Sequence, residues 1–314
     1  MEGKRSKKKA RIKLARAFIA KAVYNLPTTD MLIEMLTGNK NLRLLCGWES
    51  RYEVPSKATF SRTSAEFAEG GFTRAVLEVT IKTCCGDKVA GCVSRDSTPI
   101  AGREKPAPKV PKDKTLPKRK PGRPRKGESV PPKPPERFEL QPAKSLEENL
   151  DDLPTLCDKG TEKDSKGYKK SWNGYKLHID CIDGDIPVSA ILTSASLHDS
   201  QAAILPAQMT SDRVTSLYDL MDAAYDAAAI RGFSEPLGHV PIIDHNPRRG
   251  VKTLMDPATE KRYGERNSAE RINSHLKDNH GGGNIRVKGA AKAFTHQMFG
   301  LIVIAATQIS KLTV

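Results

Sequence analysis

The stretch RYGERNSAERINSHLK, residues 262–277, carries two faces of different chemistry when it is placed on an α-helix. At about 100° per residue, four polar side chains fall within a stripe about 60° wide: Tyr263, Arg266, Glu270 and Lys277. A separate face carries the apolar side chains Ala269, Ile272 and Leu276. The pattern predicts a helix that buries its apolar side and presents a carboxylate flanked by cations on the other.

A stripe of mixed charge on a helix is most often a solvated face held by pairs of oppositely charged side chains. Three observations favour a functional interpretation here: the spacing of the four residues, two acidic motifs upstream, and a strongly basic chain. Among 314 residues, 52 are Lys or Arg and 37 are Asp or Glu, which gives a net charge of +15. That charge favours a polyanionic partner, because cations neutralise phosphates and release counterions, although ribosomal and membrane-surface proteins share it.

The cysteines and apolar segments indicate a cytoplasmic protein. None of the six cysteines belongs to a C-x-x-C pair, and their spacings fit no zinc site, so we expect a reducing compartment. The basic N-terminus is not followed by an apolar stretch with a cleavage site, as a secretory signal would be. Residues 298–306 (MFGLIVIAA) are apolar but far fewer than the ~20 that span a bilayer, so we expect a buried helix and no membrane partner.

Residues 1–80 are predicted to form a small, all-helical domain. Apolar residues recur at helical spacing over 10–23, and Ser56 can open a later helix that exposes Lys57 and Arg62. Such a domain is suited to DNA binding, and we assign Lys57 and Arg62 as DNA contacts. A generic helical bundle fits the same pattern equally well.

Residues 101–166 are interpreted as a long, basic, Pro-rich insertion. Its first part, 101–127, holds eleven Lys or Arg, two acids and six prolines. Such a composition cannot bury a core, so we expect the insertion to be disordered throughout 101–166. Within it, KRKPGRPRKG resembles an AT-hook, in which Arg123 and Arg125 would lie in a narrow A·T minor groove. Plain electrostatic tethering to DNA explains the same residues.

The rest of the chain alternates strands and helices. We expect strands at 88–96, 172–182, 186–193, 216–222 and 239–244, with helices near 199–209, 225–232, 262–277 and 290–311. A hairpin followed by strand-helix alternation predicts an α/β domain over 86–314, with a mixed sheet and flanking helices. This order is similar to the ribonuclease H-like fold. That fold carries acids on its first strand, after its fourth strand and on a late helix, the places of Asp96, Asp222 and Glu270.

Three acids from distant parts of the chain suit metal-assisted cleavage of phosphodiester bonds. Two Mg²⁺ ions about 3.5–4 Å apart can activate water and stabilise the leaving oxygen, and Mg²⁺ prefers carboxylate and phosphate oxygens. We assign Asp96 to bridge both ions, Asp222 to one ion and Glu270 to the other, with Mn²⁺ as a substitute metal. An isolated Asp at a strand end is more often a turn cap.

The motifs resemble those of bacterial insertion-sequence transposases of the DDE class. In particular, Tyr263, Arg266, Glu270 and Lys277 reproduce the spacing that marks insertion-sequence family four. RDSTPI around Asp96 and MDAAYDA around Asp222 resemble the first and second acidic motifs, with Ala224 where the family often has Gly.

The resemblance implies a role for each matching residue. Glu270 would be the third catalytic acid, Arg266 and Lys277 would hold phosphates of the transposon end, and Tyr263 would contact the DNA backbone. Arg offers a planar fork to phosphate and Lys a compact charge. The family also places a β-rich segment between its second Asp and the Glu, for which Asp222 and Glu270 are too close in sequence.

We therefore expect a DNA transposase of the bacterial cytoplasm, associated with the nucleoid. It would bind the terminal inverted repeats of its own element as a homodimer, hydrolyse strands with Mg²⁺ and transfer them into target DNA. Two alternatives remain open: a catalytically silent remnant that only binds DNA, and a non-transposing nuclease of the same fold.

Overall fold

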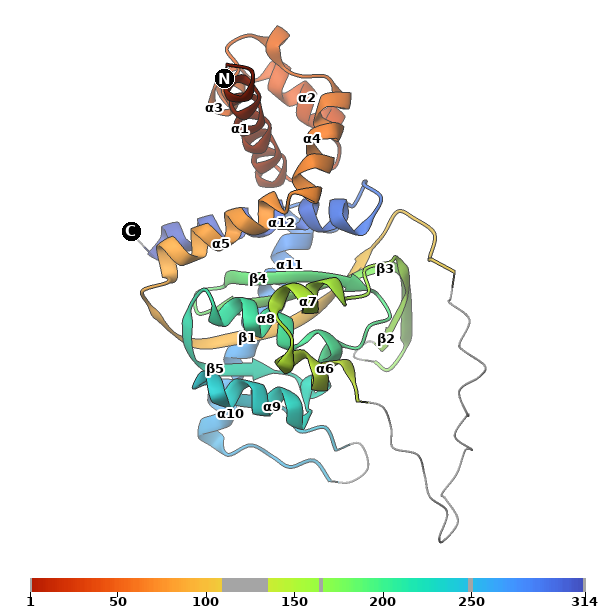
Figure 1. Cartoon of the computed structure of the whole chain (residues 1–314), viewed down its shortest axis with the longest axis vertical. Coiled ribbons are helices and arrows are strands. Elements are labelled where there is room, and N and C mark those ends of the chain that lie inside the picture. Colours follow the sequence, from red (N-terminus) through yellow and green to blue (C-terminus); the bar gives the residue numbers. More distant parts are fainter. Residues whose placement is uncertain (1, 109–134, 164–165, 248–250, 313–314) are drawn as a thin grey trace.

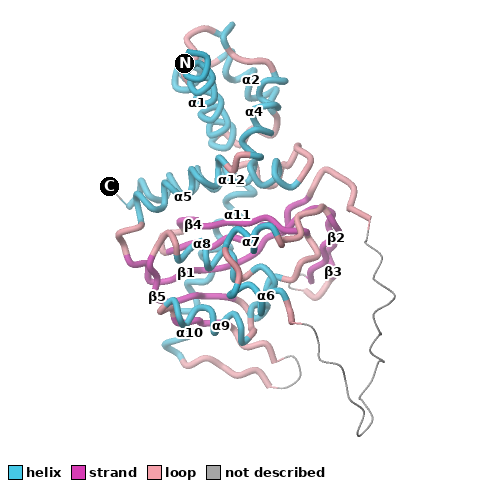
Figure 2. Tube along the Cα trace, in the orientation of Figure 1, coloured by secondary structure: helices cyan, strands magenta, loops and turns pink. Residues whose placement is uncertain are grey.

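The computed structural model describes residues 2–108, 135–163, 166–247 and 251–312, with side chains from residue 9 onward. A group of helices from the N-terminal part of the chain lies above a sheet that is covered by helices on both faces (Figure 1). Figure 2 shows the same division, with the strands gathered in the lower body.

The N-terminal part of the chain is helical, as predicted. Its helices are α1 (Glu2–Val23), α2 (Thr29–Gly38), α3 (Lys40–Cys46), α4 (Lys57–Glu69) and α5 (Phe72–Cys85), with the 3₁₀ turn η1 (Arg51–Glu53) before α4. The hydroxyl of Thr28 caps α2 by accepting a hydrogen bond from the backbone N–H of Met31 at 3.2 Å. Gly47 ends α3 in the left-handed region, with φ of 103°, which glycine adopts without steric cost.

The long helix α12 (Ala290–Leu312) joins the two bodies. Phe18 of α1 stacks on Phe299 of α12 with ring centroids 5.3 Å apart, and Val303 lies in the same apolar cluster. By length and composition α12 could cross a bilayer, but 61% of its most apolar window is buried inside the protein. The expectation of a buried helix over 298–306 is therefore confirmed.

In the described part of the chain, the sheet is mixed and has six strands. They are β1 (Val89–Ala101), β2 (Asp158–Lys163), β3 (Lys169–Ile182), β4 (Ile186–Ser194), β5 (Thr215–Met221) and β6 (Val240–Ile243). Strand β3 pairs antiparallel with β1, β2 and β4, whereas β5 pairs parallel with both β1 and β6. The β3–β4 turn uses positive φ at Gly184 and Asp185. This mixed sheet with flanking helices is compatible with the ribonuclease H-like fold.

Alternation along β3 separates the two faces of the sheet. Leu177 and Ile179 belong to the core formed with α5, α12 and α11 (Asn267–Asn279), because successive strand residues point to opposite sides. Alternating with them, His178 and Asp180 point to the side of α8 (Ile204–Ser211), where Thr210 donates to Asp180. The connections contain η3 (Asp199–Ala202), η4 (Ala223–Tyr225), α9 (Ala228–Ser234), η5 (Glu235–Leu237), α10 (Pro257–Tyr263) and η6 (Gly264–Arg266).

The expectation of disorder throughout 101–166 is wrong for the residues that the structure describes. Residues 135–163 contain α6 (Arg137–Leu140), η2 (Gln141–Ala143), α7 (Leu146–Asp151) and β2. Leu153 is buried against the apolar side of α8, and β2 pairs with β3. A capping box between Ser145 and Glu148 starts α7. Residues 109–134, including Arg123 and Arg125, lie outside the described residues.

Candidate active site

Asp96 lies within β1 rather than at its end, because the strand continues to Ala101. Its side chain points to the face covered by α11, where Asn273 Nδ2 donates to Asp96 Oδ2 at 3.1 Å. Burial, together with smaller contributions from the charges of Asp222 and Glu270, raises the pKa of Asp96 to about 7. The structure thus brings the three predicted acids into one electrostatic neighbourhood.

Asp222 directly follows β5, where β1 and β5 run parallel. Its Oδ1 accepts a hydrogen bond from the backbone N–H of Ala224 at 2.9 Å and so caps η4. The cap is the ordinary role of an Asp at a strand end. Burial nevertheless raises the pKa of Asp222, and the neighbouring charges of Asp199 and Asp244 add to that effect. Asp222 therefore combines a capping role with membership of an acidic cluster.

Glu270 lies on α11, whose apolar residues Ala269, Ile272 and Leu276 are buried, as the helical pattern predicts. The side chain of Glu270 is 50% exposed, and its Oε1 accepts a hydrogen bond from Arg266 Nη2 at 2.7 Å. The carboxylate therefore stands at the protein surface beside a cation.

The single helix predicted over 262–277 is interrupted by a short 3₁₀ helix. Helix α10 ends at Tyr263 and η6 contains Arg266 before α11 begins. The Arg266 guanidinium still lies 5.6 Å from the centre of the Tyr263 ring. At the other end of α11, Lys277 Nζ donates to Thr98 Oγ1 at 2.5 Å, which places this cation two residues along β1 from Asp96.

The carboxylates are suitable ligands for a hard metal ion, although they are not arranged as a complete metal-binding site. Within the described ranges, no three His, Cys, Asp or Glu side chains are grouped closely enough to hold a metal ion. Two observations nevertheless fit a divalent cation. Like charges crowd around Asp96, and the buried Oδ1 of Asn273 has no hydrogen-bond partner in the described part of the chain. Carboxylate and amide oxygens are ligands that Mg²⁺ accepts.

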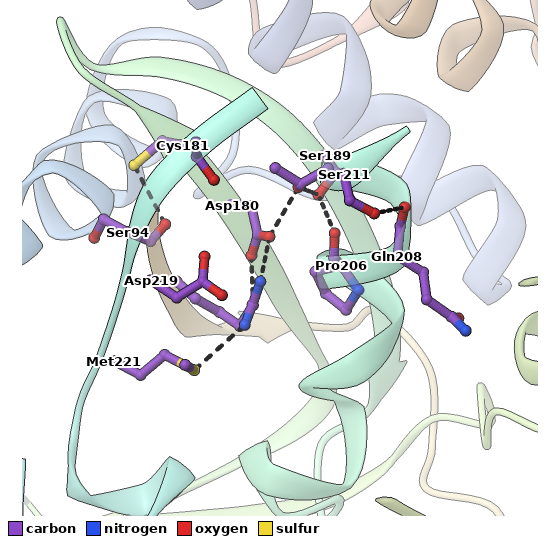
Figure 3. Close-up of polar contacts among 12 residues, drawn as sticks. Ser94, Asp180, Cys181, Ser189, Pro206, Gln208, Ser211, Asp219 and Met221 are labelled. Atoms are coloured by element: carbon purple, nitrogen blue, oxygen red, sulfur yellow. Dashed lines mark hydrogen bonds and ion pairs between the residues drawn. The ribbon is translucent and has the colours of Figure 1, made fainter. Parts of the chain in front are cut away.

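A buried ion pair lies directly behind Asp96 and was not predicted from the sequence. Arg95 Nε and Nη2 donate to the two carboxylate oxygens of Asp180 at 2.7 and 2.6 Å. Arg95 Nη1 also contacts the sulfur of Met221 at 3.3 Å, and Figure 3 shows Asp180, Asp219 and Met221 grouped there. Because Met221 precedes Asp222, this one guanidinium links the strands that carry two of the acids.

Three further neighbours of the site were also missed. Asn273 and Thr98 hold α11 against β1, and Asp199 accepts hydrogen bonds from Ser97 and Lys176 on the opposite side of β1. The i, i+3 spacing of Glu270 and Asn273 on one helix is the only sequence signal that could have indicated Asn273.

The predicted DNA contacts Lys57 and Arg62 lie on α4, in the helical domain. Lys57 Nζ pairs with Asp30 of α2 at 2.5 Å, and Arg62 Nε donates to the backbone carbonyl of Ala58 at 3.3 Å. Neither side chain contacts the three acids within the described residues.

Comparison with known families gives two matches. A transposase domain (DUF772) matches residues 3–66, and a transposase DDE domain matches residues 96–306. The second match covers well over half of the chain and begins at Asp96. No match is found among curated proteins or among solved structures.

Proposed function

The chain belongs to the family of transposase DDE domains, and we propose that it cuts and joins DNA at the terminal inverted repeats of its own insertion sequence. The observation that carries the proposal is that the charges of Asp222 and Glu270 both act on the buried carboxyl group of Asp96. These acids come from a strand, a strand end and a helix, so only the folded chain can place them together. The Tyr263, Arg266, Glu270 and Lys277 spacing supports insertion-sequence family four.

The roles of the side chains follow from their chemistry. Asp96, Asp222 and Glu270 would hold two Mg²⁺ ions, and bound divalent metal would supply an activated water and charge stabilisation at the leaving oxygen. Arg266 and Lys277 would bind phosphates on either side of the acids, because guanidinium and ammonium groups pair with phosphate oxygens. Tyr263, beside Arg266, would pack against the DNA backbone.

Other features support DNA as the partner. The net charge of +15 favours a polyanion, and the family suggests DNA. Lys57 and Arg62 on α4, together with Arg123 and Arg125 outside the described residues, would add backbone and minor-groove contacts. We further propose a homodimer in the transposition complex and a cytoplasmic, nucleoid-associated location.

The test uses purified protein, Mg²⁺ and a plasmid that carries the native DNA flanking the gene. Wild type should cleave at defined flanking ends and transfer them into a second DNA. Glu270→Gln should bind the ends without cutting them, because the amide removes a charged metal ligand. Glu265→Gln, the same change at an exposed neighbour on η6, should cleave like wild type.

Each of the other outcomes would indicate a different function or a different set of catalytic residues. Specific retention of the ends without cleavage by wild type would indicate a DNA-binding remnant. Cleavage without strand transfer would indicate a nuclease of the same fold. Equal cleavage by wild type and Glu270→Gln would remove Glu270 from the catalytic site.

A further inference from the structure

A basic cleft lies between the helical domain and the catalytic domain. Its cavity volume is about 370 Å³, and α1, α2 and α4 face the segments that precede and begin α12 across it. Five cations line the cleft: Lys21, Lys57, Arg103, Arg286 and Lys292. Among the lining residues that the structure describes, Asp30 is the one acid, and it pairs with Lys57.

The other four cations have no acidic partner within the described residues. Arg103, Arg286 and Lys292 are exposed, whereas Lys21 is partly buried. Removal from water without a compensating acid lowers the pKa of Lys21 to about 8. Unpaired like charges repel one another and gain free energy when an anion binds between them. The cleft is therefore a site of uncompensated positive charge rather than an internal network of ion pairs.

The catalytic-domain side of the cleft is held in place by a partly buried acid, Glu104. Glu104 Oε1 accepts a hydrogen bond from the backbone N–H of Gly289 at 3.0 Å, and it also accepts one from the hydroxyl of Tyr175. These contacts fix the segment that carries Arg103 against the segment that carries Arg286 and Lys292. The three cations come from positions far apart in sequence, and Glu104 keeps them on one side of the cleft.

The helical-domain side offers neutral hydrogen-bond donors. Thr28, Thr29, Ser61 and Ser64 line it, and Thr28 and Thr29 belong to the N-terminal turn of α2. Hydroxyl groups and helix N-termini donate hydrogen bonds to phosphate oxygens. Both walls thus carry groups that recognise phosphate, and cations are contributed from both domains.

We propose that this cleft binds the sugar-phosphate backbone of duplex DNA, at a place separate from the three acids. The proposal rests on DNA being the partner, as in the proposed function. Cations spread over two domains suit successive phosphates of a polymer, whereas a single phosphate ion would need only part of the cleft. DNA in the cleft would also fix the helical domain relative to the catalytic domain.

The test compares two triple variants of the full chain. Arg103→Gln/Arg286→Gln/Lys292→Gln removes three exposed cations from the cleft. Lys40→Gln/Lys88→Gln/Lys311→Gln removes three exposed cations that do not line it. Binding to a fluorescent duplex of the native flanking DNA is measured by anisotropy between about 50 and 200 mM salt. Circular dichroism checks that both variants are folded.

The expected result is specific to the cleft. A plot of the logarithm of the DNA-binding constant against the logarithm of the salt concentration has a slope to which each phosphate contact contributes about 0.9. This slope should become shallower by about 2 to 3 in the cleft variant. It should change little in the control variant. Lys292→Gln alone should reduce the slope by about 1. An unchanged slope in the cleft variants, or an equal change in the control, would overturn the proposal.

A competition arm separates a polymer site from a site for free phosphate. Inorganic phosphate, at the same ionic strength as chloride, should not displace the duplex from wild type. Selective displacement by phosphate from wild type but not from the cleft variant would indicate a site for the free ion and would contradict the proposal. If wild type binds no DNA under any condition, the proposed function itself fails.

Discussion

At the scale of single residues, the surroundings of Asp96 depend on contacts that join β1 to α11. Asn273 donates to the carboxylate of Asp96, and Lys277 donates to Thr98. The sequence correctly assigned Asp96 to the first strand and Glu270 and Lys277 to one helix, because motif spacing and helical periodicity are local properties, but it ended the strand at Asp96 whereas β1 continues to Ala101. It could not indicate Asn273 or Arg95 as neighbours of the site, because their contacts depend on how strands and helices pack.

Asn273→Ala should slow cleavage about tenfold or more while DNA binding persists, because groups that orient a metal ligand typically contribute 10- to 100-fold. The measurement is single-turnover cleavage of the native ends in Mg²⁺. Asn279→Ala, at an exposed position near the end of α11, is the matched control and should cleave at the wild-type rate. Equal rates for both variants would show that Asn273 does not orient Asp96.

Arg95 is expected to contribute strongly to stability through its pairing with Asp180. Both side chains are almost completely buried, so Arg95→Met would leave an unpaired carboxylate in the core, at a cost of about 3–5 kcal/mol. Replacing both partners, in Arg95→Met/Asp180→Leu, should restore part of that loss because the unpaired carboxylate of Asp180 is removed as well. Urea unfolding, monitored by circular dichroism, measures the free energy of unfolding of the single and the double variant. A double variant less stable than Arg95→Met would contradict this account.

At the scale of elements, the sequence predicted most strands and helices but misjudged the insertion. Alternating apolar and polar residues, together with turn residues, predicted the β3–β4 hairpin. Helical periodicity predicted the apolar face of α11. The order of 135–163 was missed because its short helices and β2 carry little periodicity of their own. They are stabilised by burying Leu153 against α8 and by pairing with β3. Such non-local packing does not appear in composition.

Leu153→Ala should lower the free energy of unfolding by about 2–5 kcal/mol, because it removes a buried side chain and leaves a cavity. Leu156→Ala, three residues later, is the control, since Leu156 is 67% exposed and its loss should have almost no effect. The denaturant midpoints of the two variants give the comparison. Equal midpoints would mean that residues 135–163 do not pack on the catalytic domain.

At the scale of the whole molecule, two histidines link stability to pH: His178, which is buried, and His296, which is partly buried. Burial lowers the pKa of His178 and of His296 to about 4, whereas the unfolded chain titrates near 6.5. The unfolded state therefore binds more protons below pH 6.5, and stability is lost as the pH falls from 6.5 toward 4. The loss should approach about 1.4 kcal/mol per pH unit for each histidine.

The variant His178→Gln/His296→Gln isolates this contribution, because glutamine offers a similarly placed Nε2 donor and does not titrate. Urea unfolding at several pH values between 4 and 7 should show a shallower pH dependence for the variant than for wild type. Parallel curves would show that the two histidines do not remain neutral in the folded protein.

The central claim is that three distant acids form one metal-dependent site for cutting DNA. A thiolate is a softer ligand than a carboxylate and binds Mg²⁺ poorly, whereas Mn²⁺ accepts it. The most direct measurement is therefore cleavage of the native flanking ends by Asp222→Cys in Mg²⁺ and in Mn²⁺. Asp212→Cys, at an exposed position after α8, is the control and should cleave in both metals.

The account predicts that Asp222→Cys binds the ends, does not cleave them in Mg²⁺ and recovers cleavage in Mn²⁺. Wild-type cleavage by Asp222→Cys in Mg²⁺, or none in either metal by a folded variant that binds the ends, would contradict it.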